Sequence, residues 1–511
     1  MGDRPHILLV MVDQLAAPFL RSYGHPVTET PTIDRLAETG VVFENAYTPS
    51  PLCAPARASL MTGQLPTRTG VYDNSAEFPS AVPTFAHYLR LEGYRTCLSG
   101  KMHFVGPDQL HGFEERLTTD VYPGDFGWTP DWGRPGERVD WWYHNMSSVK
   151  EAGVAEITNQ LEYDDEVAFH AIRRLYDYVR FEGDAPLMLC VSFSHPHDPY
   201  VARRRHWDLY TDEEIDLPAA PALPVEQLDP HSRRLWRDCA MGDVELTEDD
   251  VRASRHGYYS SLSYADERIG DVLAAFEACG LADDSVVIFT SDHGDFLGEH
   301  GLFYKMSFRE HAARVPLIVS APGRFGSRRV HEPVSLLDLA PTLADLARPG
   351  LSGALAAPVD GRSLLPLLEG GAESDETTVL GEYLAESTLG PMVMLRRGRW
   401  KFIHAPSDPD QLFDLESDPL ELANLAAAAE HAETVGQLRA EVSRRWDLDA
   451  VERDVRASQR ARLSVFRALQ QGTPYPWDFQ PSRPAAAQYT RNTALDVTLR
   501  DRQSRFPPAS S

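Results

Sequence analysis

Acidic and imidazole side chains follow directly after two of the most apolar segments of the chain. Residues 7–12, Ile-Leu-Leu-Val-Met-Val, run into Asp13, and residues 286–291 run into Asp292 and His293. In an open α/β sheet the ligand lies at the carboxyl ends of the strands, so we expect these side chains to converge on one crevice. Two carboxylates and one imidazole suit Ca²⁺, Mg²⁺ or Mn²⁺ better than a thiolate-preferring ion. Taken singly, each Asp fits equally well as the cap of a following helix.

A second group of reactive side chains surrounds Cys53. The sequence Cys53-Ala-Pro-Ala-Arg57 continues to Thr62-Gly63, so a nucleophile and a guanidinium stand four residues apart. An ordinary thiol nucleophile is one interpretation of this segment. The sequence contains none of the signatures G-x-S-x-G, H-E-x-x-H or G-x-x-x-x-G-K-[ST], which argues against the other common hydrolases and against P-loop enzymes.

The pattern C-x-P-x-R…T-G resembles the signature of the sulfatases, enzymes of the alkaline-phosphatase-like superfamily in which the cysteine is oxidised to formylglycine. Residues 292–298 resemble that family's late metal-binding motif, and residues 12–14 its early one. Gln14 and His293 depart from the Asp and Asn of many arylsulfatases, and Ala56 replaces a Ser often found in the cysteine motif. The first two departures favour the choline-sulfatase and phosphonate-monoester-hydrolase branches.

Short patches along nearly the whole chain resemble choline-sulfatases in particular. They are residues 50–53, 70–74, 99–103, 106–113, 143–145, 194–199 and 475–480. Each patch is weak alone, but their order along the chain makes the combined signal strong. The resemblance implies hydrolysis of choline O-sulfate to choline and sulfate. The alternatives are a phosphonate monoester hydrolase or an arylsulfatase on the same fold, and a non-catalytic choline-binding protein if Cys53 is unmodified.

The resemblance also implies a role for each polar residue of the site. One hydroxyl of the formylglycine hydrate attacks sulfur and the other later expels sulfate, which is covalent catalysis with its own exit route. The implied ligands of one divalent metal, Ca²⁺ first and Mn²⁺ or Mg²⁺ as alternatives, are Asp13, residue 53, Asp292 and His293. The implied catalytic set is Cys53, Arg57, Lys101, His103, His197 and Lys305. Within it the lysines clamp the sulfate, His103 is the base that collapses the hemiacetal, and His197, with Lys305, is the acid at the leaving oxygen.

Substrate choice is expected to depend on an aromatic segment. Residues 126–144 hold four tryptophans among many Gly and Pro residues, and aromatic faces bind quaternary ammonium groups. Packing alone explains most such clusters. By the resemblance, the substrate-binding residues are Asn74, Trp128, His144, Glu382 and Asp496. Glu382 would supply a negative charge from the C-terminal part, and Asp496 a further acidic contact from an adjacent subunit.

These residues need a scaffold, and the apolar pattern indicates one. The short apolar runs at residues 7–12, 187–193, 286–290 and 315–320 predict buried strands of a largely parallel sheet. Amphipathic stretches at 163–181 and 262–278 predict helices between them. Strands that alternate with helices indicate an α/β fold, here an alkaline-phosphatase-like layer structure with helices on both faces of the sheet.

The C-terminal part has a different texture. Residues 377–383, 392–396 and 399–404 predict strands, and residues 425–446 a helix, whereas the prolines after Gly472 forbid regular structure. We therefore expect three units: a catalytic domain over 1–372, a small domain with an antiparallel sheet and a helix over 373–460, and a tail over 461–511. The tail's large aromatic residues suggest that it docks on a neighbouring subunit of a homodimer or homotetramer.

Composition restricts the partners and the compartment. The 511 residues carry 49 basic and 76 acidic side chains, a net charge of −27, which argues against nucleic acid and anionic membranes as partners. No apolar run approaches the ~18 residues of a membrane span, and no signal-peptide pattern follows the N-terminus. Five dispersed cysteines do not form a disulfide framework. A cytoplasmic enzyme that meets a formylglycine-installing enzyme is the expectation.

Overall fold

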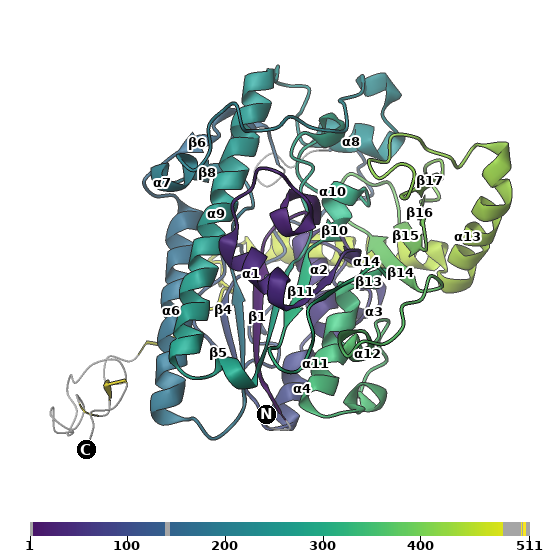
Figure 1. Ribbon diagram of the computed structural model, residues 1–511. Helices are drawn as coiled ribbons and strands as arrows, with labels where there is room; N and C mark the ends of the chain where they lie inside the picture. Colours follow the sequence, from purple (N-terminus) through teal and green to yellow (C-terminus); the bar gives the residue numbers. More distant parts are fainter. Residues whose placement is uncertain (1–3, 138–143, 484–501, 503, 507–511) are drawn as a thin grey trace.

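A computed structural model describes residues 4–137, 144–483, 502 and 504–506. Its centre is an eight-stranded sheet in the order β12-β2-β11-β9-β1-β7-β4-β5 (Figure 1). Its strands are β1 His6–Val12, β2 Val41–Phe43, β4 Arg95–Gly100, β5 Glu115–Arg116, β7 Leu187–Ser192, β9 Ser285–Ser291, β11 Leu317–Ser320 and β12 Arg328–Val330. β1 pairs in parallel with β7 and β9, whereas β11 is antiparallel to β9 and β2. The mostly parallel sheet confirms the expected α/β class.

Helices cover both faces of this sheet because successive side chains of a strand point to opposite faces. Leu8, Val10 and Val12 of β1 belong to the core on the side of α1 Pro31–Thr39, α6 Asn159–Phe181 and α9 Glu248–Ala278. Ile7, Leu9 and Met11 belong to the opposite core, on the side of α2 Cys53–Thr62, α4 Phe85–Leu91 and α11 Leu339–Ala347. The carboxyl ends of β1 and β9, which carry Asp13 and Asp292, therefore lie between two packed layers of helices.

Local capping and one proline account for differences from the expected boundaries. α6 begins at Asn159 because Thr158 accepts a hydrogen bond from the Leu161 amide, and α9 begins at Glu248, after the Thr247 cap. The strand expected over 315–320 is interrupted at Pro316, which has no N–H to donate. It becomes β10 Arg314–Val315, which pairs with β3 Ala46–Tyr47, and β11 in the central sheet.

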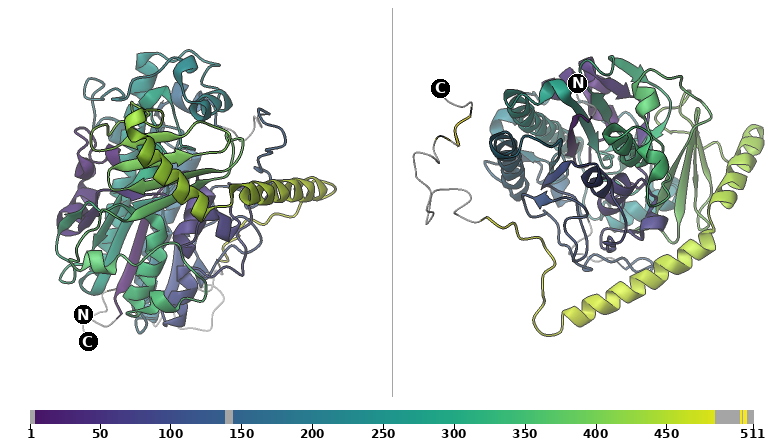
Figure 2. Two further views of the ribbon diagram at one scale, coloured as in Figure 1. Left: turned by 90° about the vertical axis from the view of Figure 1, so that its right-hand side faces the viewer. Right: turned by 90° about the horizontal axis from the view of Figure 1, so that it is seen from below.

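The C-terminal part is built on a second, antiparallel sheet (Figure 2). Its strands and helices are β14 Thr378–Tyr383, β15 Met392–Arg397, β16 Trp400–His404, β17 Gln411–Asp414, α13 Ala432–Arg445 and α14 Leu448–Leu469. The helix expected over 425–446 is shorter, because Asn424 accepts from the amides of Leu412 and Ala426 and holds a turn there. α14 crosses the boundary expected at residue 460 and extends from the second sheet back along the α/β core.

After α14 the described chain, up to residue 483, contains no helix or strand. Trp477 packs edge-on against Phe126, and Asp478 accepts a hydrogen bond from the Gly124 amide, so this segment contacts its own chain. Docking on a neighbouring subunit stays a prediction. Among the described helices, none is long and apolar enough to cross a membrane. The remaining elements include α3 Pro66–Thr69, α5 Ser147–Lys150, α7 Arg204–Trp207, α8 Pro230–Asp238, α10 Glu310–Ala313, α12 Leu365–Leu368, β6 Gly153–Val154, β8 Val201–Ala202 and β13 Val334–Ser335.

Candidate active site

The register of two neighbouring strands places Asp13 beside Asp292. β1 and β9 run in parallel with Val12 opposite Ser291, so the next residue of each strand is one of these two aspartates. His293 follows immediately, and all three side chains are fully buried. Strand pairing alone therefore brings together the residues expected to converge at this sheet edge.

Cys53 lies at the same carboxyl end of the sheet, at the start of helix α2, which packs on one face of the sheet. It is the first residue of α2, and its Sγ lies 3.2 Å from Nε2 of His293. Asn74 Oδ1 accepts a hydrogen bond of 2.9 Å from the Ala54 amide and so fixes the first turn of this helix. One ligand atom from each of Asp13, Cys53, Asp292 and His293 lies within 4.8 Å of the others.

These four residues fit a divalent cation. Oδ1 of Asp13 is buried and has no hydrogen-bond partner among the described residues, as expected of an atom reserved for a metal. Burial lowers the pKa of His293, which keeps its imidazole neutral and able to ligate. Burial opposes ionisation of Asp13, but Lys101 and other nearby cations hold its pKa well below the usual range. Residue 53, in whatever chemical form, completes the set.

Arg57 holds the site together from within α2. Its guanidinium is fully buried and donates to Asp292 Oδ2 at 2.8 Å, to the Lys101 carbonyl at 2.6 Å and to Ser192 Oγ at 2.9 Å. Lys101 in turn bonds Asp13 and lies 3.7 Å from Cys53 Sγ. Cys53 and Arg57 thus stand about one turn apart on α2, at the four-residue spacing of the sequence motif.

His197 and Lys305 form a pair that lines the same cavity as Cys53. Nζ of Lys305 lies 2.8 Å from Nε2 of His197 and 2.5 Å from Oε1 of Gln14. Nδ1 of His197 lies 3.2 Å from Oδ1 of Asp198. Burial, reinforced by Lys305, lowers the pKa of His197 well below its usual value, so the imidazole is neutral in this arrangement.

A cavity of about 370 Å³ opens above these residues. Of the residues expected from the sequence, it is lined by Cys53, Asn74, Trp128, His144, His197 and Lys305. It is also lined by Tyr122, Asp198 and Glu386, which the sequence reasoning missed. Tyr122 carried no motif signal, and Asp198 stood unused inside the patch 194–199. His144 stacks on Tyr304, with ring centroids 4.2 Å apart.

The carboxylate expected from the sequence, Glu382, lies behind the cavity wall. Glu382 is fully buried but is not among the lining residues; its carboxylate accepts from the Thr67 amide and hydroxyl and from Trp446 Nε1. Glu386, four residues later, lines the cavity instead, and its Oε2 has no hydrogen-bond partner among the described residues. Burial raises the pKa of Glu386 to about 7.

Two further residues expected from the sequence, His103 and Asp496, are not among the described residues that line the cavity. His103 does not line the cavity; its ring packs edge-on against Trp128 at 5.8 Å and tilted against Tyr122 at 5.1 Å. Neither of its ring nitrogens has a hydrogen-bond partner within the described parts of the chain. Asp496 lies outside the described residues. The roles of all these side chains stay predictions.

Comparison with known proteins agrees with this arrangement. The Sulfatase family model matches residues 5–349, the N-sulphoglucosamine sulphohydrolase C-terminal model matches 298–447, and the choline sulfatase enzyme C-terminal model matches 453–506. A choline-sulfatase of Rhizobium meliloti (strain 1021) is 50% identical over 512 residues, 99% of each chain. An arylsulfatase of Clostridium perfringens is 28% identical and covers 85% of this chain and 93% of its own length.

Solved structures share the fold. A phosphonate monoester hydrolase of Agrobacterium radiobacter superimposes with a TM-score of 0.70 at 24% identity, covering 89% of this chain and 96% of its own. A putative sulfatase of Bacteroides fragilis gives a TM-score of 0.68 at 23% identity, with 87% and 96% covered. The family match spans the strands and helices that carry Asp13, Cys53, Asp292 and His293. The chain belongs to the sulfatase family.

Proposed function

We propose that this protein is a choline-sulfatase, which hydrolyses choline O-sulfate to choline and sulfate. The observation that carries the proposal is the wall of the Cys53 cavity, where an indole, Trp128, and a buried carboxylate, Glu386, stand beside the catalytic residues. An aromatic face and a carboxylate are the groups that attract a quaternary ammonium ion. The relative that is 50% identical over 99% of both chains is named choline-sulfatase.

The chain's own residues would act at two ends of the sulfate group. Lys101 places a positive charge 3.7 Å from Cys53 Sγ, and Lys305 places another on the side of His197. Fixed cations on both sides stabilise the charge that builds on the sulfate oxygens as the bond breaks. Arg57, through Asp292 and the Lys101 carbonyl, keeps these groups in place.

The leaving oxygen of choline needs a proton. The Lys305 ammonium points at Nε2 of neutral His197, so the pair holds one proton where the choline oxygen would depart. Transfer of that proton as the S–O bond breaks lets choline leave with a neutral hydroxyl group rather than as an alkoxide. Asp198, next to Nδ1, fixes the orientation of the imidazole.

Two groups outside the unmodified sequence complete the proposal. Formylglycine, made from Cys53 by an installing enzyme, would supply the nucleophilic hydroxyl through its hydrate. A bound divalent cation, Ca²⁺ first with Mn²⁺ or Mg²⁺ as alternatives, would supply the positive charge that acidifies this hydroxyl. The residues that would hold the cation are Asp13, residue 53, Asp292 and His293. A cytoplasmic location and a homodimer or homotetramer belong to the same proposal; all five cysteines are free and buried, as in proteins of reducing compartments.

A turnover panel tests the activity. We expect kcat/KM for choline O-sulfate to exceed the values for 4-nitrophenyl sulfate and phenylphosphonate monoesters by orders of magnitude. The second candidate, a phosphonate monoester hydrolase, is favoured by Gln14 beside Asp13 and by the shared fold, and a reversed order of kcat/KM would establish it.

Peptide mass spectrometry tests the nucleophile: conversion of the thiol lowers the mass of the Cys53 peptide by ~18 Da. An unmodified peptide from inactive protein that binds choline would instead establish a non-catalytic binding protein.

A further inference from the structure

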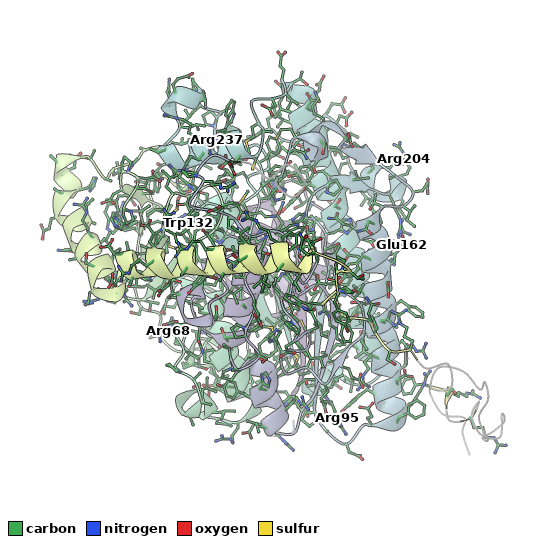
Figure 3. The ribbon with its side chains drawn as sticks, turned by 180° about the vertical axis from the view of Figure 1, so that it is seen from behind. Arg68, Arg95, Trp132, Glu162, Arg204 and Arg237 are labelled. Atoms are coloured by element: carbon green, nitrogen blue, oxygen red, sulfur yellow. The ribbon has the colours of Figure 1, made fainter. Side chains whose placement is uncertain are left out.

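Three segments that line the Cys53 cavity are joined by a helix outside it. The segments are residues 73–75, which include Asn74, residues 128–132, which include Trp128, and residues 384–389, which include Glu386. α14 lies across the surface of the molecule on this side, next to Trp132 (Figure 3). It lines no part of the cavity itself. It nevertheless contacts all three segments.

Arg462 joins the first two segments. Its guanidinium donates to Asp73 Oδ1 at 2.7 Å and Oδ2 at 2.6 Å, and to Thr129 Oγ1 at 3.1 Å. Asp73 precedes Asn74 and Thr129 follows Trp128, so one planar group fixes the neighbours of two cavity residues. The arginine is 6% exposed and Asp73 is fully buried. A bidentate guanidinium–carboxylate pair is directional as well as strong.

A hydrogen-bond chain extends this contact to Trp128. Asp73 Oδ1 accepts from the Ser75 amide at 3.0 Å, and Ser75 Oγ accepts from the Trp128 amide at 3.2 Å. Asp73 and Ser75 therefore connect Arg462 of α14 to the backbone of Trp128. A displaced Arg462 would displace the ring without removing any atom of the cavity.

The same face of α14 holds the third segment. Gln459 Oε1 accepts from the Trp132 amide at 2.9 Å, and Trp132 Nε1 donates to the Ala385 carbonyl at 2.7 Å, next to Glu386. Val455, fully buried, packs in one cluster with Trp132 and Leu384. Positions 455, 459 and 462 recur at helical spacing, so one stripe of the helix contacts the backs of all three segments.

We propose that α14 sets the substrate specificity of the cavity, with Arg462 as its principal positioning residue. Arg462 holds Trp128, and α14 as a whole holds Glu386, at the separation that a quaternary ammonium group requires. The sulfate-binding residues are held by α2 and the sheet, and the hydrogen bond from the Ala54 amide to Asn74 joins α2 to the first of the three segments. The inference rests on the proposed choline-sulfate activity. It predicts that loss of Arg462 weakens recognition of the cation and leaves the chemistry at sulfur intact.

The experiment compares two substrates in four proteins. The proteins are the wild type, Arg462→Gln, the double variant Asp73→Asn/Arg462→Gln, and Arg460→Gln, a control on the exposed face of the same helix. The double variant leaves no unpaired buried carboxylate, so it tests positioning even if the single variant does not fold. The substrates are choline O-sulfate and 4-nitrophenyl sulfate, which has no cation. Calorimetric choline binding gives a readout independent of turnover.

We expect KM for choline O-sulfate and Kd for choline to rise about tenfold or more in the double variant, with kcat/KM for 4-nitrophenyl sulfate within about threefold of wild type. Arg460→Gln should match wild type on both substrates. Equal losses on both substrates, or choline binding unchanged in the double variant, would overturn the proposal. Wild-type protein that does not hydrolyse choline O-sulfate would instead contradict the proposed function, so the two failures are separate.

Discussion

Nε2 of His197 lies 2.8 Å from Nζ of Lys305, so this imidazole nitrogen of the Cys53 cavity is already paired with a cation. Replacement of His197 by Ala should therefore lower kcat most for the ester whose leaving oxygen is most basic. We expect kcat for choline O-sulfate to fall by about 10²–10⁴, and kcat for 4-nitrophenyl sulfate, whose phenolate leaves without a proton, to fall much less. Steady-state kinetics on both esters measures the difference. An equal loss on both would show that His197 acts on the sulfate rather than on the leaving group.

Glu386 predicts a pH dependence of cation binding. Burial, with the charge of Asp73 added, raises its pKa to about 7, so the carboxyl group of the free protein is neutral below that pH and ionised above it. Since the cation binds the ionised form, the inhibition constant of choline should rise as pH falls below 7, approaching ~tenfold per pH unit. Glu386→Gln should remove this dependence.

Glu382 provides the matched control. Burial also raises its pKa to about 7, but its carboxylate is held by Thr67 and Trp446 away from the cavity. Glu382→Gln should therefore keep the pH dependence of choline inhibition. If this variant loses the dependence and Glu386→Gln keeps it, the assignment of the cavity carboxylate is wrong.

The two glutamates, Glu382 and Glu386, also show what could not be predicted from the sequence. The register of β1 with β9 follows from apolar strands, so the meeting of Asp13 and Asp292 could be predicted from their positions after those strands. Which of Glu382 and Glu386 faces the cavity could not. It depends on the chain leaving β14 at Tyr383 and on the Trp132–Ala385 contact across more than 250 residues. Such a contact leaves no local pattern in the sequence.

α14 is a further case. Residues 448–469 carry a helical pattern, but the apolar content of its inner face is modest, because Gln459 and Arg462 occupy two of its three buried positions. From the sequence alone, polar side chains at these positions predict a solvated helix or the start of a tail. Their partners Asp73 and Trp132 lie more than 300 residues away, so the burial becomes visible only in three dimensions.

Trp128 should contribute to affinity and not to chemistry. A well-placed indole is worth about 1–2 kcal/mol to a quaternary ammonium ion, which corresponds to a ~5–30-fold rise in KM for choline O-sulfate in Trp128→Ala. Trp128→Phe keeps a ring and should lose less. The ratio of KM values for choline O-sulfate and 4-nitrophenyl sulfate checks the effect. A parallel rise for both esters would assign the indole to packing alone.

Metal removal should abolish activity on every ester. Prolonged chelation is expected to remove one divalent ion per chain together with turnover of both substrates, because the nucleophile loses the group that acidifies it. Ca²⁺ or Mn²⁺ should restore both, and Asp292→Asn should bind the ion more weakly. Elemental analysis of the dialysed protein provides the count. Full activity in protein that contains no metal would rule out the ligand set of Asp13, Cys53, Asp292 and His293.

Lys401 is expected to matter for stability and not for specificity. It is fully buried, and its Nζ lies 2.6 Å from Glu310 Oε1 and 2.7 Å from Glu421 Oε1, at the contact between the second sheet and the α/β core. Burial opposes its charge, but Glu310 and Glu421 together raise its pKa, so it is charged throughout the physiological range. Lys401→Met would leave Glu421 without this cation and Glu310 with the longer contact of 3.9 Å to Arg314.

Breaking a buried ionic pair in this way costs about 3–5 kcal/mol in the free energy of unfolding. Urea denaturation of Lys401→Met and of Lys150→Met, a control at a partly exposed ion pair with Asp250, measures the difference. The surface variant should lose at most about 1 kcal/mol. Because both carboxylates lose their shortest ion pair, the triple variant Lys401→Met/Glu310→Gln/Glu421→Gln should recover part of the loss. No recovery in the triple variant would show that the lysine stabilises through its hydrogen bond to the Phe308 carbonyl rather than through its charge.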